Sequence, residues 1–197
     1  MDAVCGGEVV KKLNGLNPLS KYNFIMGQYY YAIILDESGK IVAWMNAFPY
    51  GEGVKLMEHS YLNSVFVNTF EFLLSAEGPY YKSRVVWGGD YADNENGQEK
   101  NLYHLCTEDE SKLLTPREKD SSKYCYIVNH TKRQYVDKRK FQTIHPLPLL
   151  TAEGNGRGGG DCGDAPPIVG TWSRDVISVE EVVPEGFEQI VFELPRD

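Results

Sequence analysis

The chain has 197 residues, of which 42% are apolar and 24% are charged, and these values are ordinary for one globular domain. A chain of this length usually buries about 70% of the surface that its unfolded form exposes, so it needs no disulfide or metal to stabilise a core. Twenty Lys and Arg residues against 28 Asp and Glu residues give a net charge of −8. The composition excludes a fibre, a coiled coil and a protein that coats nucleic acid or anionic membrane with its whole surface, and it leaves a local basic patch open.

The cysteines and the N-terminal segment indicate a reducing compartment. Cys5, Cys106, Cys125 and Cys162 form no Cys-x-x-Cys pair, so the sequence predicts neither a zinc ribbon nor a thioredoxin-type site. The first residues lack the apolar region of a secretory signal, and no apolar run approaches the ~20 residues that a membrane-spanning helix needs. We therefore expect a cytoplasmic protein with no membrane partner.

The N-terminal part of the chain is predicted to divide into an extension and the start of a sheet. Residues 1–22 contain few apolar side chains, so we expect a peripheral extension there and a single domain over residues 23–197. Aromatic and β-branched residues from 24 to 35, followed by an Asp-Glu-Ser-Gly turn and the apolar run 41–45, predict a β-hairpin. Its first strand carries bulky residues on both faces, which is typical of a strand in the middle of a sheet or of one covered on both sides.

An amphipathic helix is predicted over residues 62–74. Apolar residues recur there at spacings of three and four, with Ser60 as the expected N-cap and Glu71 on the side that faces water. A short buried strand over 83–87 and a weaker helix over 101–106 are expected to follow.

The second half of the chain predicts further strands around an irregular stretch. A second hairpin is expected from 123–129 and 134–136, and strands are expected at 175–179 and 188–194. The pattern predicts the α+β class: one domain with a mainly antiparallel sheet packed against one main amphipathic helix, and a long Gly/Pro-rich loop near the C-terminus, over residues 144–167. The expected core includes Tyr29, Tyr31, Ile33, Leu35, Val65, Phe66, Phe70, Leu73, Val86, Trp87, Tyr126 and Val128.

The glycine-rich segment is a candidate anion-binding loop. Gly154, Gly156 and Gly159 match G-x-G-x-x-G, but prolines flank the segment where a dinucleotide site needs a strand and a helix. Consecutive backbone N–H groups beside a cation can still form a nest for a phosphate or carboxylate. The candidate ligand-binding residues are Gly156, Arg157, Gly158 and Asp161, and a plain surface loop is the alternative interpretation.

Two further segments carry candidate catalytic residues. Asp90 and Asp93 follow a buried strand and two glycines, where carboxylates could hold Mg²⁺ or Ca²⁺ or act as a general base. A solvated Asx turn is the alternative. His59, next to Glu58, precedes the predicted helix, and a neutral imidazole there could serve as base or ligand, with simple packing as the alternative. No histidine has a partner at the spacing of a zinc-binding helix, so no metal or cofactor is assigned.

The segment Lys132–Lys140 holds five cations in nine residues. Such a patch can contact the phosphates of nucleic acid, and it is the one place where the sequence leaves such a partner open. A solvated hairpin balanced by nearby acids is the alternative, because only one tyrosine is interleaved with the cations.

Several segments together resemble an uncharacterised family of small bacterial and phage proteins. They are MGQYY (26–30), KLMEHSY (55–61), VVWGGDYAD (85–93), YIVNHTK (126–132) and LPLLTAEGNGRGGGD (147–161). Because members of that family begin at the first of these segments, the resemblance implies that residues 1–25 are an extension and that the setting is a bacterial or phage cytosol. It implies no activity and no catalytic residue.

Two functional hypotheses follow. The first is a site that binds or hydrolyses a small anionic ligand, namely a nucleotide or a phosphorylated metabolite. In this hypothesis Asp90 and Asp93 lie within reach of His59 or of the glycine-rich segment, and together they form one concave site. The second is a non-enzymatic interaction factor of phage or mobile-element origin, which would contact a host protein through its tyrosines and the segment Lys132–Lys140.

Overall fold

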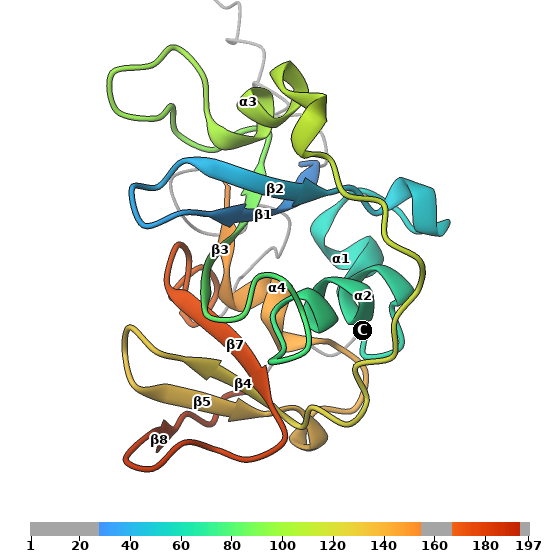
Figure 1. Ribbon diagram of the computed structural model, residues 1–197, viewed down its shortest axis with the longest axis vertical. Helices are drawn as coiled ribbons and strands as arrows, with labels where there is room; N and C mark the ends of the chain where they lie inside the picture. The colour runs from blue at the N-terminus through green and yellow to red at the C-terminus, as the bar shows by residue number, and fades with distance from the viewer. Residues whose placement is uncertain (1–27, 155–166, 194–197) are drawn as a thin grey trace, which may run out of the picture.

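The computed structural model describes residues 28–154 and 167–193 (Figure 1). These residues form one eight-stranded sheet and four α-helices. The strands are β1 (Tyr30–Leu35), β2 (Ile41–Met45), β3 (Ser83–Gly89), β4 (Tyr126–Asn129), β5 (Gln134–Asp137), β6 (Ala152–Glu153), β7 (Val176–Glu180) and β8 (Glu188–Gln189). The helices are α1 (Leu56–His59), α2 (Val65–Leu73), α3 (Leu102–Glu108) and α4 (Pro146–Leu150), with short 3-10 helices at Phe48–Tyr50, Glu110–Lys112 and Lys138–Lys140.

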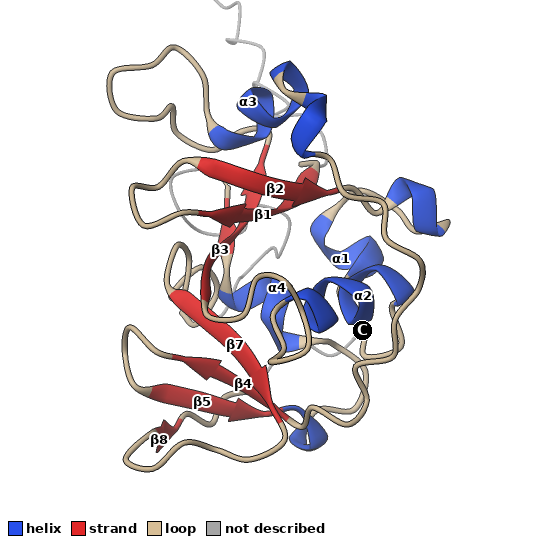
Figure 2. Ribbon diagram, viewed as in Figure 1, coloured by secondary structure: helices blue, strands red, loops and turns tan. Residues whose placement is uncertain are grey.

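The sheet is mostly antiparallel, as the sequence predicted, and it has two halves. Its order is β2-β1-β3-β7-β4-β5-β8, with β6 beside β3, and the parallel pairs are β3–β6 and β5–β8. Strands β3 and β7 share only two residue pairs, Ser83 with Ile177 and Arg84 with Val176. Figure 2 shows the half containing β2, β1 and β3 set apart from the half containing β7, β4, β5 and β8, with α1, α2 and α4 grouped together and α3 beyond β2.

Side-chain alternation along β1 divides the interior into two cores. Tyr30, Ala32 and Ile34 belong to the main core, whereas Tyr31, Ile33 and Leu35 belong to a smaller core that includes Leu102 and Cys106 of α3. All six residues of β1 are buried, because helices cover both of its faces. The prediction of a strand covered on both sides is therefore confirmed.

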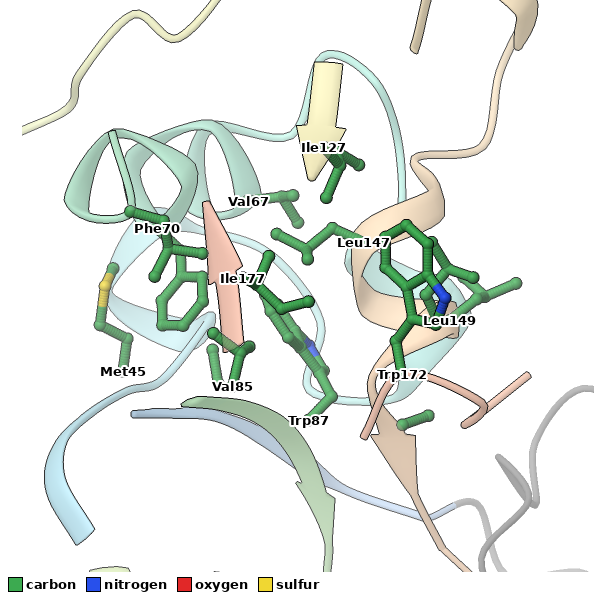
Figure 3. Packing of buried hydrophobic residues seen from close by; sticks show 14 of the residues in the cluster. Met45, Val67, Phe70, Val85, Trp87, Ile127, Leu147, Leu149, Trp172 and Ile177 are labelled. Atoms are coloured by element: carbon green, nitrogen blue, oxygen red, sulfur yellow. The ribbon is translucent and has the colours of Figure 1, made fainter. Parts of the chain in front are cut away.

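The main core joins the sheet to helices that are distant in sequence. Phe70 of α2 meets Trp87 of β3 edge to face, with 4.9 Å between the ring centroids. Figure 3 shows these two rings together with Leu147 of α4 and Ile177 of β7. Packing of this kind holds the two halves of the sheet against one helical layer.

The predicted helix over 62–74 begins later than expected. Helix α2 starts at Val65, and its N-cap is Ser64, whose hydroxyl oxygen accepts the N–H of Val67 at 3.0 Å. Ser60 was the wrong choice, because it lies at the end of α1 and its hydroxyl donates to the Leu56 carbonyl at 2.6 Å. Glu71 was also placed wrongly, since it is fully buried and does not face water.

Regular structure also appears where the sequence indicated none. Helix α4 lies inside the Pro-rich stretch, with Pro146 in its first turn, where a missing N–H costs nothing. Of the expected core, Tyr29 is 44% exposed and Val65 and Tyr126 are half-buried, while the other nine residues are buried. The extension 1–22 and most of the glycine-rich stretch lie outside the described residues. No described helix has both the length and the apolar character needed to cross a membrane.

Candidate functional site

A small polar cavity lies where three distant chain segments meet, and we call it the Arg174 cavity. Its volume is about 60 Å³. The segments are the loop after β3, the end of β6 and the turn before β7. Its lining residues are Ala92, Asp93, Asn94, Glu95, Asn96, Glu153, Gly154 and Arg174.

Arg174 joins two of these segments through paired hydrogen bonds. Its Nε and Nη2 atoms each donate to the Glu153 carboxylate at 2.7 Å, and Nη1 donates to Glu95 Oε2 at 2.9 Å. Hydrogen bonds that Arg174 donates to Glu95, and then to Glu153, raise its pKa above its already high value, so the guanidinium group stays charged.

The backbone of Arg174 has an unusual conformation. Its φ angle is 64°, in the left-handed region that side chains other than glycine seldom adopt. Its N–H donates to the Val85 carbonyl at 2.8 Å, and its own carbonyl accepts from Arg84 Nη1 at 3.0 Å. Contacts on both sides thus hold a strained conformation, and such conformations are concentrated at functional sites.

Two glycines let the backbone approach Gln28 closely beside the cavity. A Cβ atom on Gly154 would lie 2.4 Å from Gln28 Oε1, and one on Gly89 would lie 2.4 Å from Gln28 Nε2. The Tyr30 hydroxyl donates to Gln28 Oε1 at 2.8 Å. These contacts place the start of the glycine-rich segment at the cavity. The candidate residues Gly156, Arg157, Gly158 and Asp161 lie outside the described residues.

The structure gives Asp90 and Asp93 different roles. Asp93 lines the Arg174 cavity together with Gly154. Asp90 does not line it, and its Oδ1 atom accepts the N–H of Tyr29 at 3.1 Å. The Asp90 carbonyl accepts from Asn101 Nδ2 at 3.0 Å. Asp90 therefore orders the loop that presents Asp93.

His59 is a buried residue of the main core and is not among the residues that line the cavity. It is 0% exposed, and its ring meets Phe66 edge to face. Its Nε2 atom accepts from Trp87 Nε1 at 2.9 Å, which places the ring proton on Nδ1, 2.9 Å from the Gly53 carbonyl. Burial lowers the pKa of His59 to about 4, so the ring is neutral at pH 7. Its neighbour Glu58 accepts the Lys55 N–H at 3.2 Å and caps α1.

No sequence motif marks the most constrained residues of the cavity. Glu95 follows Asp93 in the same acidic loop, but Glu153 and Arg174 stand alone in their segments. Their pairing depends on β6 and β7 lying one after the other along the same edge of β3, opposite the edge that pairs with β1. A lone arginine before a strand becomes informative only when its backbone angle is known.

A larger cleft of about 360 Å³ lies next to the cavity, between the β1–β2 turn and α3. Leu102, Leu105 and Cys106 of α3 provide apolar lining, and Lys40 and Lys112 lie among its charged residues. Burial raises the pKa of the Cys106 thiol well above its ordinary value, so this thiol is unreactive. Glu95 lines both spaces and connects them.

The basic segment Lys132–Lys140 is mostly engaged within the protein. Lys132 Nζ lies 3.2 Å from Asp175 Oδ2, and Arg133 Nη2 donates to the Gly186 carbonyl at 3.4 Å. Arg139 pairs with Asp137 at 2.8 Å, and Lys138 pairs with a buried glutamate. A nucleic acid would have to compete with these partners, which disfavours the segment as a general phosphate-binding surface.

That buried glutamate is Glu71, and we call its surroundings the Glu71 cluster. Its Oε2 atom accepts from Ser121 Oγ at 2.7 Å and from Lys138 Nζ at 2.6 Å, and Oε1 lies 3.2 Å from His145 Nε2. Nδ1 of His145 accepts the Leu147 N–H at 3.2 Å, which leaves a ring proton on Nε2, facing Glu71. Burial by itself raises the pKa of Glu71, but the nearby His145 and Lys138 lower it by more. The pKa of Glu71 is therefore well below its usual value.

Comparisons with known proteins identify no relative of the chain. No protein-family model matches the chain, and neither a curated protein nor a solved structure matches it. Within residues 28–154 and 167–193, no group of three His, Cys, Asp or Glu side chains is arranged to hold a metal ion.

Proposed function

We propose that the protein binds a small polar ligand in the Arg174 cavity. The observation that carries this proposal is Arg174 itself, which is held at a strained φ of 64° between glutamates from two distant segments. Packing alone does not require this arrangement, because Arg174 lies at the protein surface with 35% of its side chain exposed. A ligand can displace one of the two glutamates from the Arg174 guanidinium group, or it can bind beside both glutamates.

The charges of the described lining residues favour a ligand that donates hydrogen bonds. Asp93, Glu95 and Glu153 supply three carboxylates against the single cation Arg174. An ammonium group or a set of hydroxyl groups complements that balance, whereas a phosphate would meet like charge. A nucleotide or phosphorylated metabolite would depend instead on Arg157 and the glycine-rich segment.

The volumes suggest how such a ligand divides between the two spaces. A cavity of about 60 Å³ holds one functional group, and the adjoining cleft of about 360 Å³ has the size of small-molecule sites. In this proposal α2 is the main amphipathic helix that supports the sheet, and Gly154, where the glycine-rich segment begins, contributes to the ligand site. Binding is proposed without hydrolysis, because His59 is not at the cavity.

A ligand screen with matched variants tests the proposal. Thermal unfolding of the full chain is measured with alkylamines, polyols, nucleotides and sugar phosphates, since a ligand at 100 times its Kd adds about 2.7 kcal/mol. Amines or polyols should stabilise the wild type, and Asp93→Asn should weaken that effect at least tenfold. The control Glu99→Gln changes the same charge in the same loop, at a residue that does not line the cavity.

Two outcomes contradict the proposal. One is equal loss of binding in Asp93→Asn and Glu99→Gln, which would indicate a nonspecific charge effect. The other is stabilisation by nucleotides or sugar phosphates alone, which would move the ligand to the glycine-rich segment.

The interaction-factor hypothesis keeps one supporting observation. Phe48, Val182 and Val191 are each at least 75% exposed, which is high for large apolar side chains. If no small molecule stabilises the protein, a host protein docking on such side chains becomes the better proposal. Loss of partner capture in Phe48→Ser would then be its test.

A further inference from the structure

We propose that a second site, which we call the Lys138 pocket, binds a small molecule that carries an anionic group on an apolar body. The pocket has a volume of about 230 Å³ and lies between α2 and the 3-10 helix Lys138–Lys140. Its lining residues are Leu62, Asn68, Ser122, Tyr124, Cys125, Lys138, Arg139, Phe141 and His145. This site does not depend on the Arg174 cavity.

The charge of the lining is opposite to that of the Arg174 cavity. Lys138 and Arg139 are cations, and no acidic residue is among the described residues that line the pocket. An anion bound there would therefore face positive groups on a protein whose net charge is −8. Guanidinium and ammonium groups are also the side chains that best bind carboxylate or phosphate.

The two cations are positioned before any ligand binds. The Lys138 side chain is only 11% exposed, and its Nζ is held at 2.6 Å from Glu71, which is 0% exposed. Arg139 donates from Nε to Asp137 at 2.8 Å and lies over the Tyr126 ring at 5.1 Å. Neither acid lines the pocket, so each fixes a cation without occupying the space in front of it.

The walls of the pocket supply apolar surface and hydrogen-bond donors. Leu62, Phe141 and the ring of Tyr124 form apolar wall, while Asn68 and Ser122 bring an amide and a hydroxyl. Tyr124 is only 3% exposed, and its hydroxyl interacts with Glu77 and Lys123, which are not among the lining residues. The ring of Tyr124 is therefore the part that contributes to the pocket.

These features together define the ligand class. A volume of about 230 Å³ accommodates a single ring or a branched chain with one charged group. Inorganic phosphate would leave the apolar wall without a contact, and a neutral ring would leave the two cations without a partner. Both are therefore expected to bind more weakly than a ligand that has an apolar body and a charged group. A small aromatic carboxylate or phosphate monoester satisfies both conditions.

The test uses calorimetric titration of the full chain with phenyl phosphate and phenylacetate. Benzyl alcohol and inorganic phosphate serve as the neutral and ring-free probes. At least one aromatic anion should bind ten times more tightly than either of these probes, which corresponds to about 1.4 kcal/mol. Arg139→Gln should weaken that binding about tenfold, while Lys140→Gln, an equal charge change on an exposed neighbour outside the lining, should leave it within twofold.

A second variant separates blockage of the pocket from loss of charge. Ser122 is exposed at the pocket, so Ser122→Trp should preserve folding and abolish binding of the aromatic anion by filling the space. Asp93→Asn should leave this binding unchanged, because it alters only the other site. Equal effects of Arg139→Gln and Lys140→Gln, equal affinity for benzyl alcohol or for inorganic phosphate, or no binding of either aromatic anion at millimolar concentration would each overturn the proposal.

Discussion

The Arg174 cavity and the Glu71 cluster contain the same kinds of charged group in opposite arrangements. In the cavity one cation with a 35% exposed side chain lies between two glutamates. In the cluster one fully buried carboxylate lies between Lys138 and His145. A partly exposed ion pair adds little stability and can exchange a partner for a ligand, whereas a buried charge that loses its partner is left without solvation. The first arrangement suits exchange of a partner for a ligand, whereas the second keeps Lys138 paired and fixed in position at the Lys138 pocket.

Removing the cation of the buried cluster is expected to have the largest effect on stability. Lys138→Met removes one of the two charged partners of the buried Glu71 carboxylate and leaves His145 and Ser121, so we expect the free energy of unfolding to fall by about 3 kcal/mol in urea titrations. The control Lys140→Met, at an exposed neighbour, should change it by less than about 0.5 kcal/mol. The double variant Glu71→Met with Lys138→Met should recover much of the loss. A single-variant loss below about 1 kcal/mol would show that solvent reaches Glu71.

The second prediction uses pH to separate buried from accessible groups. His59 has a folded pKa of about 4, below its unfolded value of 6.5, so the unfolded state binds the proton first as pH falls. Stability is therefore complete above pH 6.5 and declines towards pH 4, by about 2 kcal/mol between pH 7.5 and pH 5. Unfolding followed over this range should show the decline in the wild type, and His59→Asn should reduce it to the part that comes from His130, whose pKa burial also lowers. Since the pKa of Glu71 is lowered, that carboxylate contributes no decline until the pH falls below its ordinary value of 4.5. A wild type and a His59→Asn variant with the same slope would contradict the buried placement of His59.

A third prediction tests the accessible side of the comparison. Arg174→Ala removes hydrogen bonds to Glu95 and Glu153 and should cost only about 1–2 kcal/mol, because solvent screens the remaining carboxylates. Arg174→Gly removes the same contacts but adopts a φ of 64° without strain, so it should be about 1 kcal/mol more stable than Arg174→Ala. Thermal unfolding compares the two. If the alanine variant is as stable as the glycine variant, the backbone strain at Arg174 is not real.

The smallest expected effect concerns the close approach at Gly154. Gly154→Ala would bring a Cβ atom to 2.4 Å from Gln28 Oε1, which is the end of a side chain that can shift. We therefore expect a loss of less than about 1 kcal/mol in stability together with weaker ligand binding at the Arg174 cavity. Adding Gln28→Ala removes one of the two close contacts, since the Cβ atom would still lie 2.7 Å from the buried Tyr30 hydroxyl, and should restore part of the stability. A loss above about 2 kcal/mol would mean that the backbone moves with the substitution.

The sequence predicted the elements whose patterns are local. The run 41–45 became β2 with the same bounds, and the hairpin of β4 and β5 forms where turn residues separate two apolar runs. The start of α2 was missed because Ser60 and Ser64 are both good N-cap residues. The structure favours Ser64, since Glu52 accepts the Ser64 hydroxyl and the Val65 N–H at 2.5 and 2.6 Å.

The candidate site was only partly predictable. Asp93 and the first glycine of the glycine-rich segment were both singled out, and they line one cavity. Glu153 and Arg174 were not, because their pairing depends on β6 and the turn before β7 meeting at the same edge of β3. Lys138 appeared in the sequence as one cation among five, and its partner Glu71 appeared as a water-facing residue.

The sequence alone predicted β2, β3, the hairpin of β4 and β5, and the body of α2, because side-chain periodicity and turn residues act over a few positions. It also determined the acidic character of the protein and the supply of polar residues after β3. Only the tertiary structure decided which polar groups are buried, since the depth of Glu71 and His59 depends on helices packed from distant parts of the chain. The same packing determines whether a charge is a support or a binding group, because the energy of an ion pair depends on how far it lies from water.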